Sequence, residues 1–105
     1  MLVSSCNAQN APDLAVQLRK QYENCVYDAV GLQWKGNLKL DPSLGAENAF
    51  QACLTEEQAI NALLYSLNTH PAQITTVLVG IKLKLKRTIR EIMADPAKYK
   101  REHGG

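Results

Sequence analysis

Hydrophobic residues recur with the period of an α-helix in three stretches of the chain. At 100° per residue, residues 12–34 place one apolar arc on one side, residues 42–68 continue a second, and residues 71–94 form a third. The arc of residues 12–34 consists of Leu14, Leu18, Tyr22, Cys25, Ala29 and Leu32, with Val26 at its edge. The buried face of residues 71–94 is expected to hold Ile74, Val77, Leu78, Ile81, Leu85, Thr88, Ile89 and Ile92. This pattern predicts an all-α protein, a small bundle of three to four helices.

Helix start and stop signals agree with these ranges. Asp41-Pro42 and Pro71 are typical of helix starts, and Asp95-Pro96 is typical of an end. Thr55-Glu56-Glu57-Gln58 resembles a capping box, which would begin a new helix near residue 56. Apolar residues after this point nevertheless stay in phase with those before it. We favour one kinked helix over residues 42–68, and a split near residue 55 is the alternative.

A second pattern favours strands. Residues 79–86 alternate apolar and polar side chains with period two, and short alternations flank residues 35–37. The alternative fold is therefore α+β, with a small sheet from residues 30–41 and 77–86. The helical phase of residues 71–94 is longer, so we prefer the all-α fold.

The length of 105 residues allows one domain with one core. We expect a flexible arm over residues 1–11, a single helical domain over 12–95, and a polar tail over 96–105. No apolar run approaches the roughly 18 residues needed to cross a bilayer. The domain is therefore expected to be soluble.

Two of the three cysteines are placed to form a disulfide. Cys25 and Cys53 lie on the apolar stripes of helices that a loop rich in turn residues should make antiparallel. Two buried free thiols are the alternative. Because disulfides persist in oxidising compartments, the predicted bridge favours a periplasmic or cell-envelope location. A cytoplasmic location would require reduced thiols.

The third cysteine, Cys6, follows Val3-Ser4-Ser5, and these four residues resemble the lipobox of bacterial lipoprotein precursors. The resemblance implies that Cys6 carries a lipid, although the positive and apolar regions of such precursors do not precede it. The chain is also similar to small exported helical proteins of Gram-negative bacteria. That likeness rests on a helix with a cysteine, a second helix begun by Pro42 and containing Ala-Phe-x-Ala-Cys, and a Glu-rich turn. It implies no activity.

Charge divides the chain into two unlike parts. Residues 1–70 hold four Lys or Arg and seven Asp or Glu, whereas residues 71–105 hold eight and three. One interpretation is that the acidic part docks against the basic helix and neutralises it. The alternative is a basic surface for an acidic partner.

The chain offers little recognisable reactive chemistry. His70 and His103 are not spaced with a cysteine or carboxylate as metal ligands. Glu56 and Glu57 are adjacent and point about 100° apart on a helix, so they cannot face one another across a substrate. No phosphate-binding glycine loop or nucleotide motif is present in the sequence. We therefore expect no catalytic residue, no cofactor, no metal and no enzyme activity.

A partner surface is expected on the last helix. Val79 and Leu83 project about 160° from Ile81, on the side away from the expected core. Basic residues surround them, namely Lys82, Lys86, Arg87 and Arg90. On the first helix, Val16, Tyr27 and Trp34 likewise point away from the predicted arc. Such a surface fits an unknown protein partner or self-association.

These observations favour a non-enzymatic helical module of the bacterial cell envelope that acts through protein–protein contact. The alternative is a cytosolic basic-helix protein that binds nucleic acid. Nucleic acid is less favoured because no aromatic residue interleaves the basic run. Membrane contact is expected only through a lipid on Cys6 or through the basic face.

Overall fold

The computed structural model describes residues 11–99, and all regular secondary structure in this range is helical. This confirms the all-α prediction. The elements are α2 (Ala11–Gly36), α3 (Pro42–Ala52), α4 (Leu54–Ser66), α5 (Pro71–Ala94) and the single turn α6 (Pro96–Tyr99).

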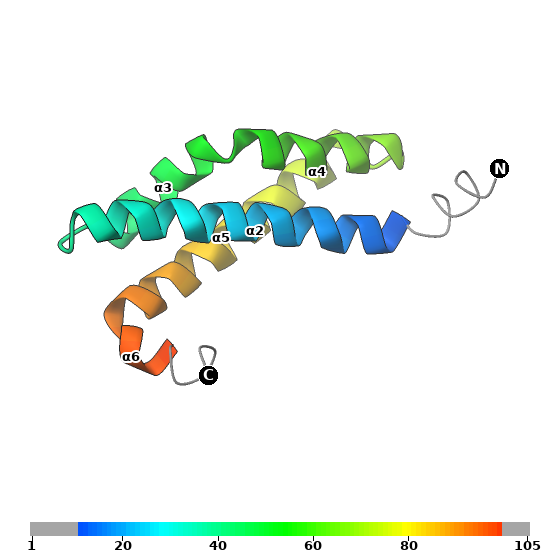
Figure 1. Ribbon diagram of the computed structural model, residues 1–105. Coiled ribbons are helices and arrows are strands. Elements are labelled where there is room, and N and C mark those ends of the chain that lie inside the picture. Colours follow the sequence, from blue (N-terminus) through cyan, green and yellow to red (C-terminus); the bar gives the residue numbers. More distant parts are fainter. Residues whose placement is uncertain (1–10, 100–105) are drawn as a thin grey trace.

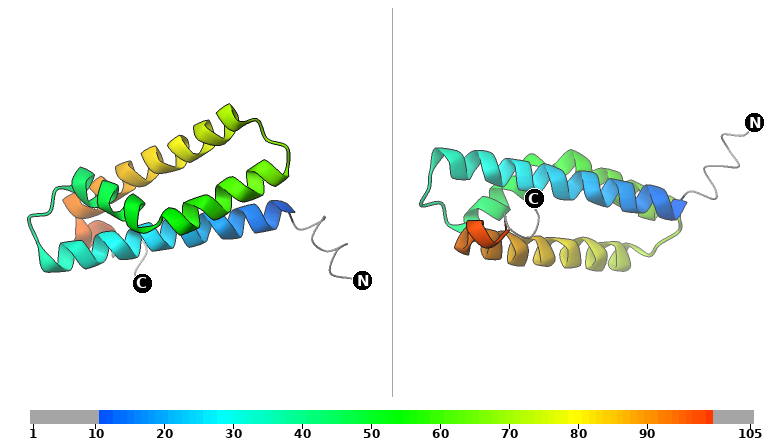
Figure 2. Two further views of the ribbon diagram at one scale, coloured as in Figure 1. Left: turned by 90° about the horizontal axis from the view of Figure 1, so that it is seen from above. Right: turned by 60° about the horizontal axis from the view of Figure 1, so that its bottom comes forward.

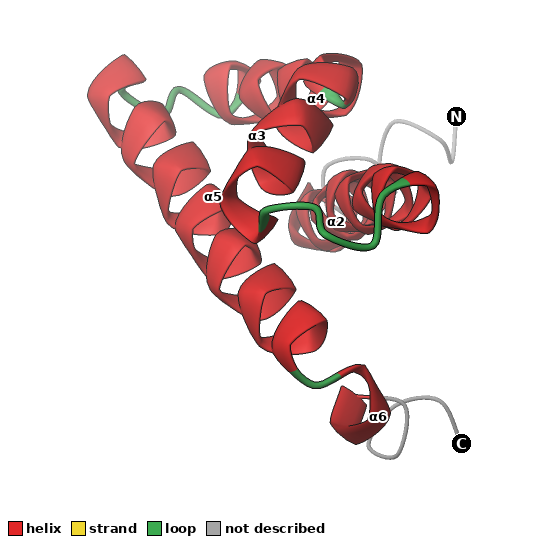
Figure 3. Cartoon of the chain, turned by 90° about the vertical axis from the view of Figure 1, so that its left-hand side faces the viewer, coloured by secondary structure: helices red, strands yellow, loops and turns green. Residues whose placement is uncertain are grey.

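α2, the successive helices α3 and α4, and α5 form the three parts of a small bundle (Figure 1). α3 and α4 follow one another along α2 and run antiparallel to it, and α5 crosses obliquely behind them. In Figure 3, α2 is seen end-on, α3 lies between α2 and α5, and α5 runs obliquely across the view. The long helices α2 and α5 therefore each pack mainly on the α3–α4 layer.

Side-chain caps begin two of the helices at the predicted places. The Asp41 carboxylate accepts the backbone N–H of Leu44 at 2.9 Å, and His70 Nδ1 accepts that of Ala72 at 3.1 Å. Each cap precedes a proline at the first helical position, which needs no amide partner. After the C-cap Leu67 of α4, Asn68 adopts the left-handed region at φ 62°, an arrangement common just beyond helix C-termini.

Residues 42–68 form two helices, so the prediction of one kinked helix is wrong. The break is at Cys53, two residues before the alternative position. The N–H of Cys53 still donates to Ala49 and Phe50, and its carbonyl still accepts from Glu57. Because the break uses one residue and leaves these groups paired, the apolar stripe crosses it without a change of phase.

The small-sheet alternative is also wrong for the residues that the structure describes. Residues 77–86 belong to α5, residues 30–36 end α2, and a turn links α2 to α3. Four buried residues of α5 follow the helical period, namely Ile74, Ile81, Leu85 and Ile89. The alternation arises because lysines stand between apolar residues that point to different sides of the helix.

The core is one cluster shared by all the long helices. Its buried members are Tyr22, Val26, Val30, Ala46, Ala49, Phe50, Cys53, Ile60, Ile81, Leu85 and Ile89. The buried face of α2 is centred on Val26, about a quarter of a turn away from the predicted arc. Leu14 and Leu32 are exposed, the latter at 74%. Tyr27, expected to point away, packs against the core.

The outer parts of the chain are described only in part. The predicted arm over 1–11 contributes Ala11 to α2, while residues 1–10, with Cys6, lie outside the described residues. The predicted tail begins with α6, and residues 100–105 lie outside as well. Within the described part, no helix has the length and apolarity required to cross a membrane.

Candidate functional site

A disulfide joins α2 to the break between α3 and α4. Cys25 and Cys53 are bonded, as predicted, with their Cα atoms 6.0 Å apart. The bridge closes a sequence separation of 28 residues, which includes the end of α2, the turn and all of α3. Cys53 is fully buried and Cys25 half-buried, so the bridge lies at the edge of the core.

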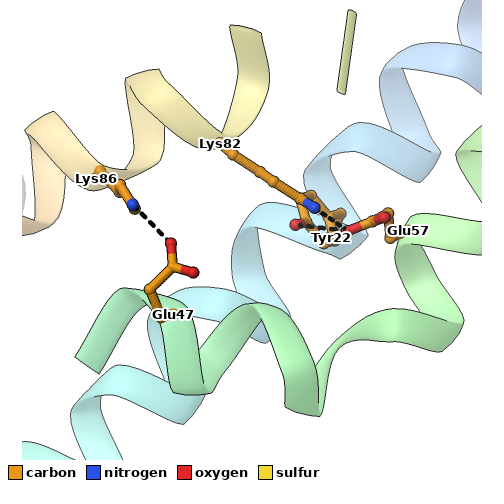
Figure 4. A network of polar contacts seen from close by, with 5 residues as sticks. All are labelled: Tyr22, Glu47, Glu57, Lys82 and Lys86. Atoms are coloured by element: carbon orange, nitrogen blue, oxygen red, sulfur yellow. Dashed lines mark hydrogen bonds and ion pairs between the residues drawn. The ribbon is translucent and has the colours of Figure 1, made fainter. Parts of the chain in front are cut away.

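A polar network lies beside this core, between α2, α4 and α5 (Figure 4). The Tyr22 hydroxyl donates to Glu57 Oε1 at 3.4 Å, and Lys82 Nζ lies 2.7 Å from the same oxygen. The ammonium of Lys82 also lies 5.7 Å from the centre of the Phe50 ring. Three helices are thus connected through one carboxylate oxygen.

Within this network, the Tyr22 hydroxyl keeps its proton. Burial and the negative charge of Glu57 raise the pKa of Tyr22 far above its ordinary value, and its hydrogen bond to Glu57 acts in the same direction. The phenol therefore stays protonated as a donor, while Lys82 neutralises the carboxylate. Such an arrangement holds helices in register.

A second ion pair joins α3 to α5. Lys86 Nζ lies 2.6 Å from Glu47 Oε1 (Figure 4). With Lys82–Glu57, this pair confirms that the acidic part of the chain docks against the basic helix. Lys82 and Lys86 therefore turn toward α4 and α3, which separates them from the partner surface predicted on α5.

The other four residues of that surface share the outer side of α5. Val79 is 48% exposed and Leu83 62%, and Arg87 and Arg90 are exposed as well. This outer face is a single helix surface with two apolar side chains. The structure places it opposite the side of α5 that holds the core.

Two apolar hollows lie between α2 and α5 and were not found from the sequence. The first, of about 370 Å³, also touches α4, and its lining is Ala15, Val16, Arg19, Ile60, Leu64, Val77, Gly80 and Ile81. The second, of about 180 Å³, is lined by Tyr27, Val30, Gly31, Trp34, Ile89, Ile92 and Met93. The sequence did contain a signal for these hollows. Three apolar residues of α2 lie outside the predicted arc and line the hollows, namely Val16, Tyr27 and Trp34.

One cluster of metal-ligand side chains occurs among the described residues. It combines the two bridged cysteines with Glu56, with one ligand atom from each lying within 4.8 Å of the others. An open hollow beside it is lined by Gln21, Asn24, Cys25, Asp28, Ala29, Leu32 and Glu56. His70 caps α5 and is not part of this cluster, and His103 lies outside the described residues.

No model of a protein family, no curated protein and no solved structure matches the chain. The proposal for its function therefore rests on the geometry of the described residues.

Proposed function

We propose that the chain is a non-enzymatic helical module of the bacterial cell envelope that acts by protein–protein contact. It holds an amphipathic helix of an acidic partner between α2 and α5. The observation that carries this proposal is the pair of apolar hollows, which lie between the same two helices, one toward each end of α2.

The shape of the bundle favours a helix as the occupant. α2 and α5 both pack on the α3–α4 layer and cross one another obliquely, and the two hollows lie between them (Figures 2 and 3). A further helix placed between α2 and α5 would bury side chains in both hollows. Its apolar residues would recur at helical spacing, which is how helices bind in grooves.

Charge favours an acidic partner. By helical position, the sides of α2 and α5 near the hollows carry three basic side chains against two acidic ones. These are Arg19, Lys20 and Lys84 against Glu23 and Glu91. Glu23 already pairs with Arg19 at 3.1 Å. A second copy of the chain is a poorer occupant, because its exposed Leu83 stands beside Arg87 and Arg90.

Two further observations support the location and disfavour the nucleic-acid alternative. The disulfide suits an oxidising compartment, and a lipid on Cys6 would tether the module to a membrane. Lys82 and Lys86, which the nucleic-acid alternative needs for phosphates, are engaged by carboxylates. Fewer free cations then remain on α5 to follow a strand.

The single tryptophan provides a direct test, because Trp34 lines the second hollow. Two tryptophan-free amphipathic peptides of about five helical turns share one apolar stripe but carry Glu or Lys on its flanks. The Glu peptide should shift Trp34 emission to shorter wavelength in a saturable manner, and salt should weaken the effect. The Lys peptide should bind at least about tenfold more weakly, a difference of about 1.4 kcal/mol.

Two variants of α5 locate the binding face. Val77→Glu places a carboxylate at the first hollow and should abolish binding of the Glu peptide, whereas Leu83→Glu on the outer face should leave it unchanged. The reverse result would move the partner to the outer face and contradict the proposal. Equal binding of both peptides would contradict the acidic partner. Retention of duplex DNA at physiological salt would favour the alternative function.

A further inference from the structure

The disulfide has a carboxylate beside it that suggests a second state of the protein. Glu56 is the third helical residue of α4, and Cys53 is the N-cap of that helix. A glutamate at this position reaches back toward the N-cap, which explains why its carboxylate lies close to both sulfur atoms. The neighbouring Glu57 turns to Tyr22 and Lys82 instead. Among the described residues, no hydrogen bond or ion pair engages the Glu56 carboxylate.

Two thiolates and a carboxylate form a ligand set typical of zinc. Zn²⁺ binds cysteine sulfur at about 2.3 Å and carboxylate oxygen at about 2.0–2.2 Å, with tetrahedral geometry. The two Sγ atoms of such a site lie about 3.8 Å apart. Cα atoms 6.0 Å apart allow this separation by side-chain rotation once the sulfur–sulfur bond is broken.

We propose that the reduced protein binds one Zn²⁺ through Cys25, Cys53 and Glu56, so that the metal and the disulfide exclude one another. A dithiol reductant supplies two electrons and two protons, breaks the sulfur–sulfur bond and is itself converted to a disulfide. The two thiols then release their protons as the metal binds, because the thiolate is the ligand. This inference does not depend on the proposed partner.

The surroundings of the cluster give the ion a route and a fourth ligand. Cys25 and Glu56 are half-buried and line the open hollow outside α2 and α4, whereas Cys53 is buried behind them. Water in this hollow would occupy the open coordination position. Asp28 follows Cys25 by three residues and lines the same hollow, where its carboxylate can accept a hydrogen bond from that water.

Cobalt provides the test, because Co²⁺ bound by thiolates in a tetrahedral site has characteristic absorption. The full chain with Cys6→Ser, which removes the third thiol, is reduced with a phosphine and titrated with Co²⁺ without oxygen. We expect one equivalent to bind, with a sulfur-to-cobalt charge-transfer band and intense visible bands that Zn²⁺ abolishes. The oxidised protein should show neither band.

A matched pair of variants identifies the carboxylate. Glu56→Gln should weaken Co²⁺ binding by at least about tenfold, whereas Glu57→Gln, one residue further, should change it by less than about threefold. Helical circular dichroism is recorded in parallel. If reduction unfolds the chain and Zn²⁺ restores its helical signal, the site is supported, because binding is then coupled to folding.

Three results would overturn the proposal. The first is a reduced protein that binds no Co²⁺, whether folded or unfolded. The second is an equal loss of affinity in both glutamine variants. The third is binding that survives replacement of Cys25 and Cys53 by serine together.

Discussion

Tyr22 shows how one buried polar atom can connect three helices. Its ring is fully buried at the centre of α2, yet its hydroxyl has a partner in Glu57. The carboxylate in turn is neutralised by Lys82, so neither charge is buried alone. No described, non-exposed side chain leaves a buried nitrogen or oxygen without a hydrogen bond. The polar contacts therefore add register to the core without leaving an unpaired group in it.

The raised pKa of Tyr22 predicts a loss of stability in alkali. In the unfolded chain a tyrosine ionises near pH 10, whereas in the folded protein Tyr22 remains protonated. The unfolded state then binds fewer protons, so the free energy of unfolding falls as pH rises above about 10, by up to about 1.4 kcal/mol per pH unit.

Tyr22→Phe should remove this contribution. Urea denaturation at several values between about pH 8 and pH 11 should give a flatter pH profile for the variant, which at neutral pH should lose about 1 kcal/mol with the hydrogen bond. Parallel profiles for the two proteins would show that Tyr22 titrates normally.

At the scale of the helices, the sequence was informative where one side of a helix is covered. The buried residues of α5 were all among those predicted, because its outer side is exposed and interrupts the pattern. The core face of α2 was misplaced, because apolar residues flank Val26 on both sides, toward α4 and toward α5. Periodicity alone does not distinguish the centre of such a wide arc from its edge.

The exposed and buried leucines of α5 should respond in opposite ways to a charge. Leu83→Glu should change the free energy of unfolding by less than about 0.5 kcal/mol, since the side chain is solvent-exposed. Its carboxylate would also stand four residues before Arg87, a favourable spacing. Leu85→Glu should cost more than about 4 kcal/mol, because it buries a charge without a partner.

Circular dichroism with urea denaturation measures both variants. Loss of structure in Leu83→Glu would place that residue in the core, against the assignment of the outer face. Retention of full stability in Leu85→Glu would mean that α5 has rotated about its axis.

At the scale of the whole molecule, the sequence predicted the disulfide but not the hollows or the ion-pair partners. Cys25 and Cys53 could be paired because they lie on the apolar stripes of two consecutive helices that were expected to be antiparallel, one cysteine on each helix. The sequence indicated that the lysines of α5 would contact the acidic half of the chain, but it did not identify Glu47 and Glu57 as their partners. The ion-pair partners depend on how α5 crosses the α3–α4 layer, and the hollows depend on how far α2 and α5 are separated. The spacing of residues along the sequence predicts neither the crossing nor the separation.

Reduction of the bridge should lower the melting temperature substantially. Opening a crosslink over 28 residues removes about 3–4 kcal/mol in the chain-entropy model. For a domain of this size the expected decrease is more than about 10 °C. The melt is recorded with a chelator, so that no metal stabilises the reduced chain.

The intact mass of the oxidised protein should be lower by two hydrogen atoms, with the loss mapped to the peptides that hold Cys25 and Cys53. A matched control is the double variant Cys25→Ala and Cys53→Ala, whose melting temperature reductant should leave unchanged. If both thiols alkylate readily without denaturant, the bridge and the main support for an envelope location are lost.

The position of the disulfide also determines how the molecule responds to mechanical force. Tension applied between the two ends of the chain passes through the sulfur–sulfur bond and bypasses the end of α2, the turn and α3. This segment cannot lengthen until the bond is reduced, which withholds on the order of 100 Å of extension. It also contains Tyr27, Val30, Gly31 and Trp34, which form the α2 wall of the second hollow. A protein tethered at one end and pulled at the other would thus keep this part of its surface shielded from the load.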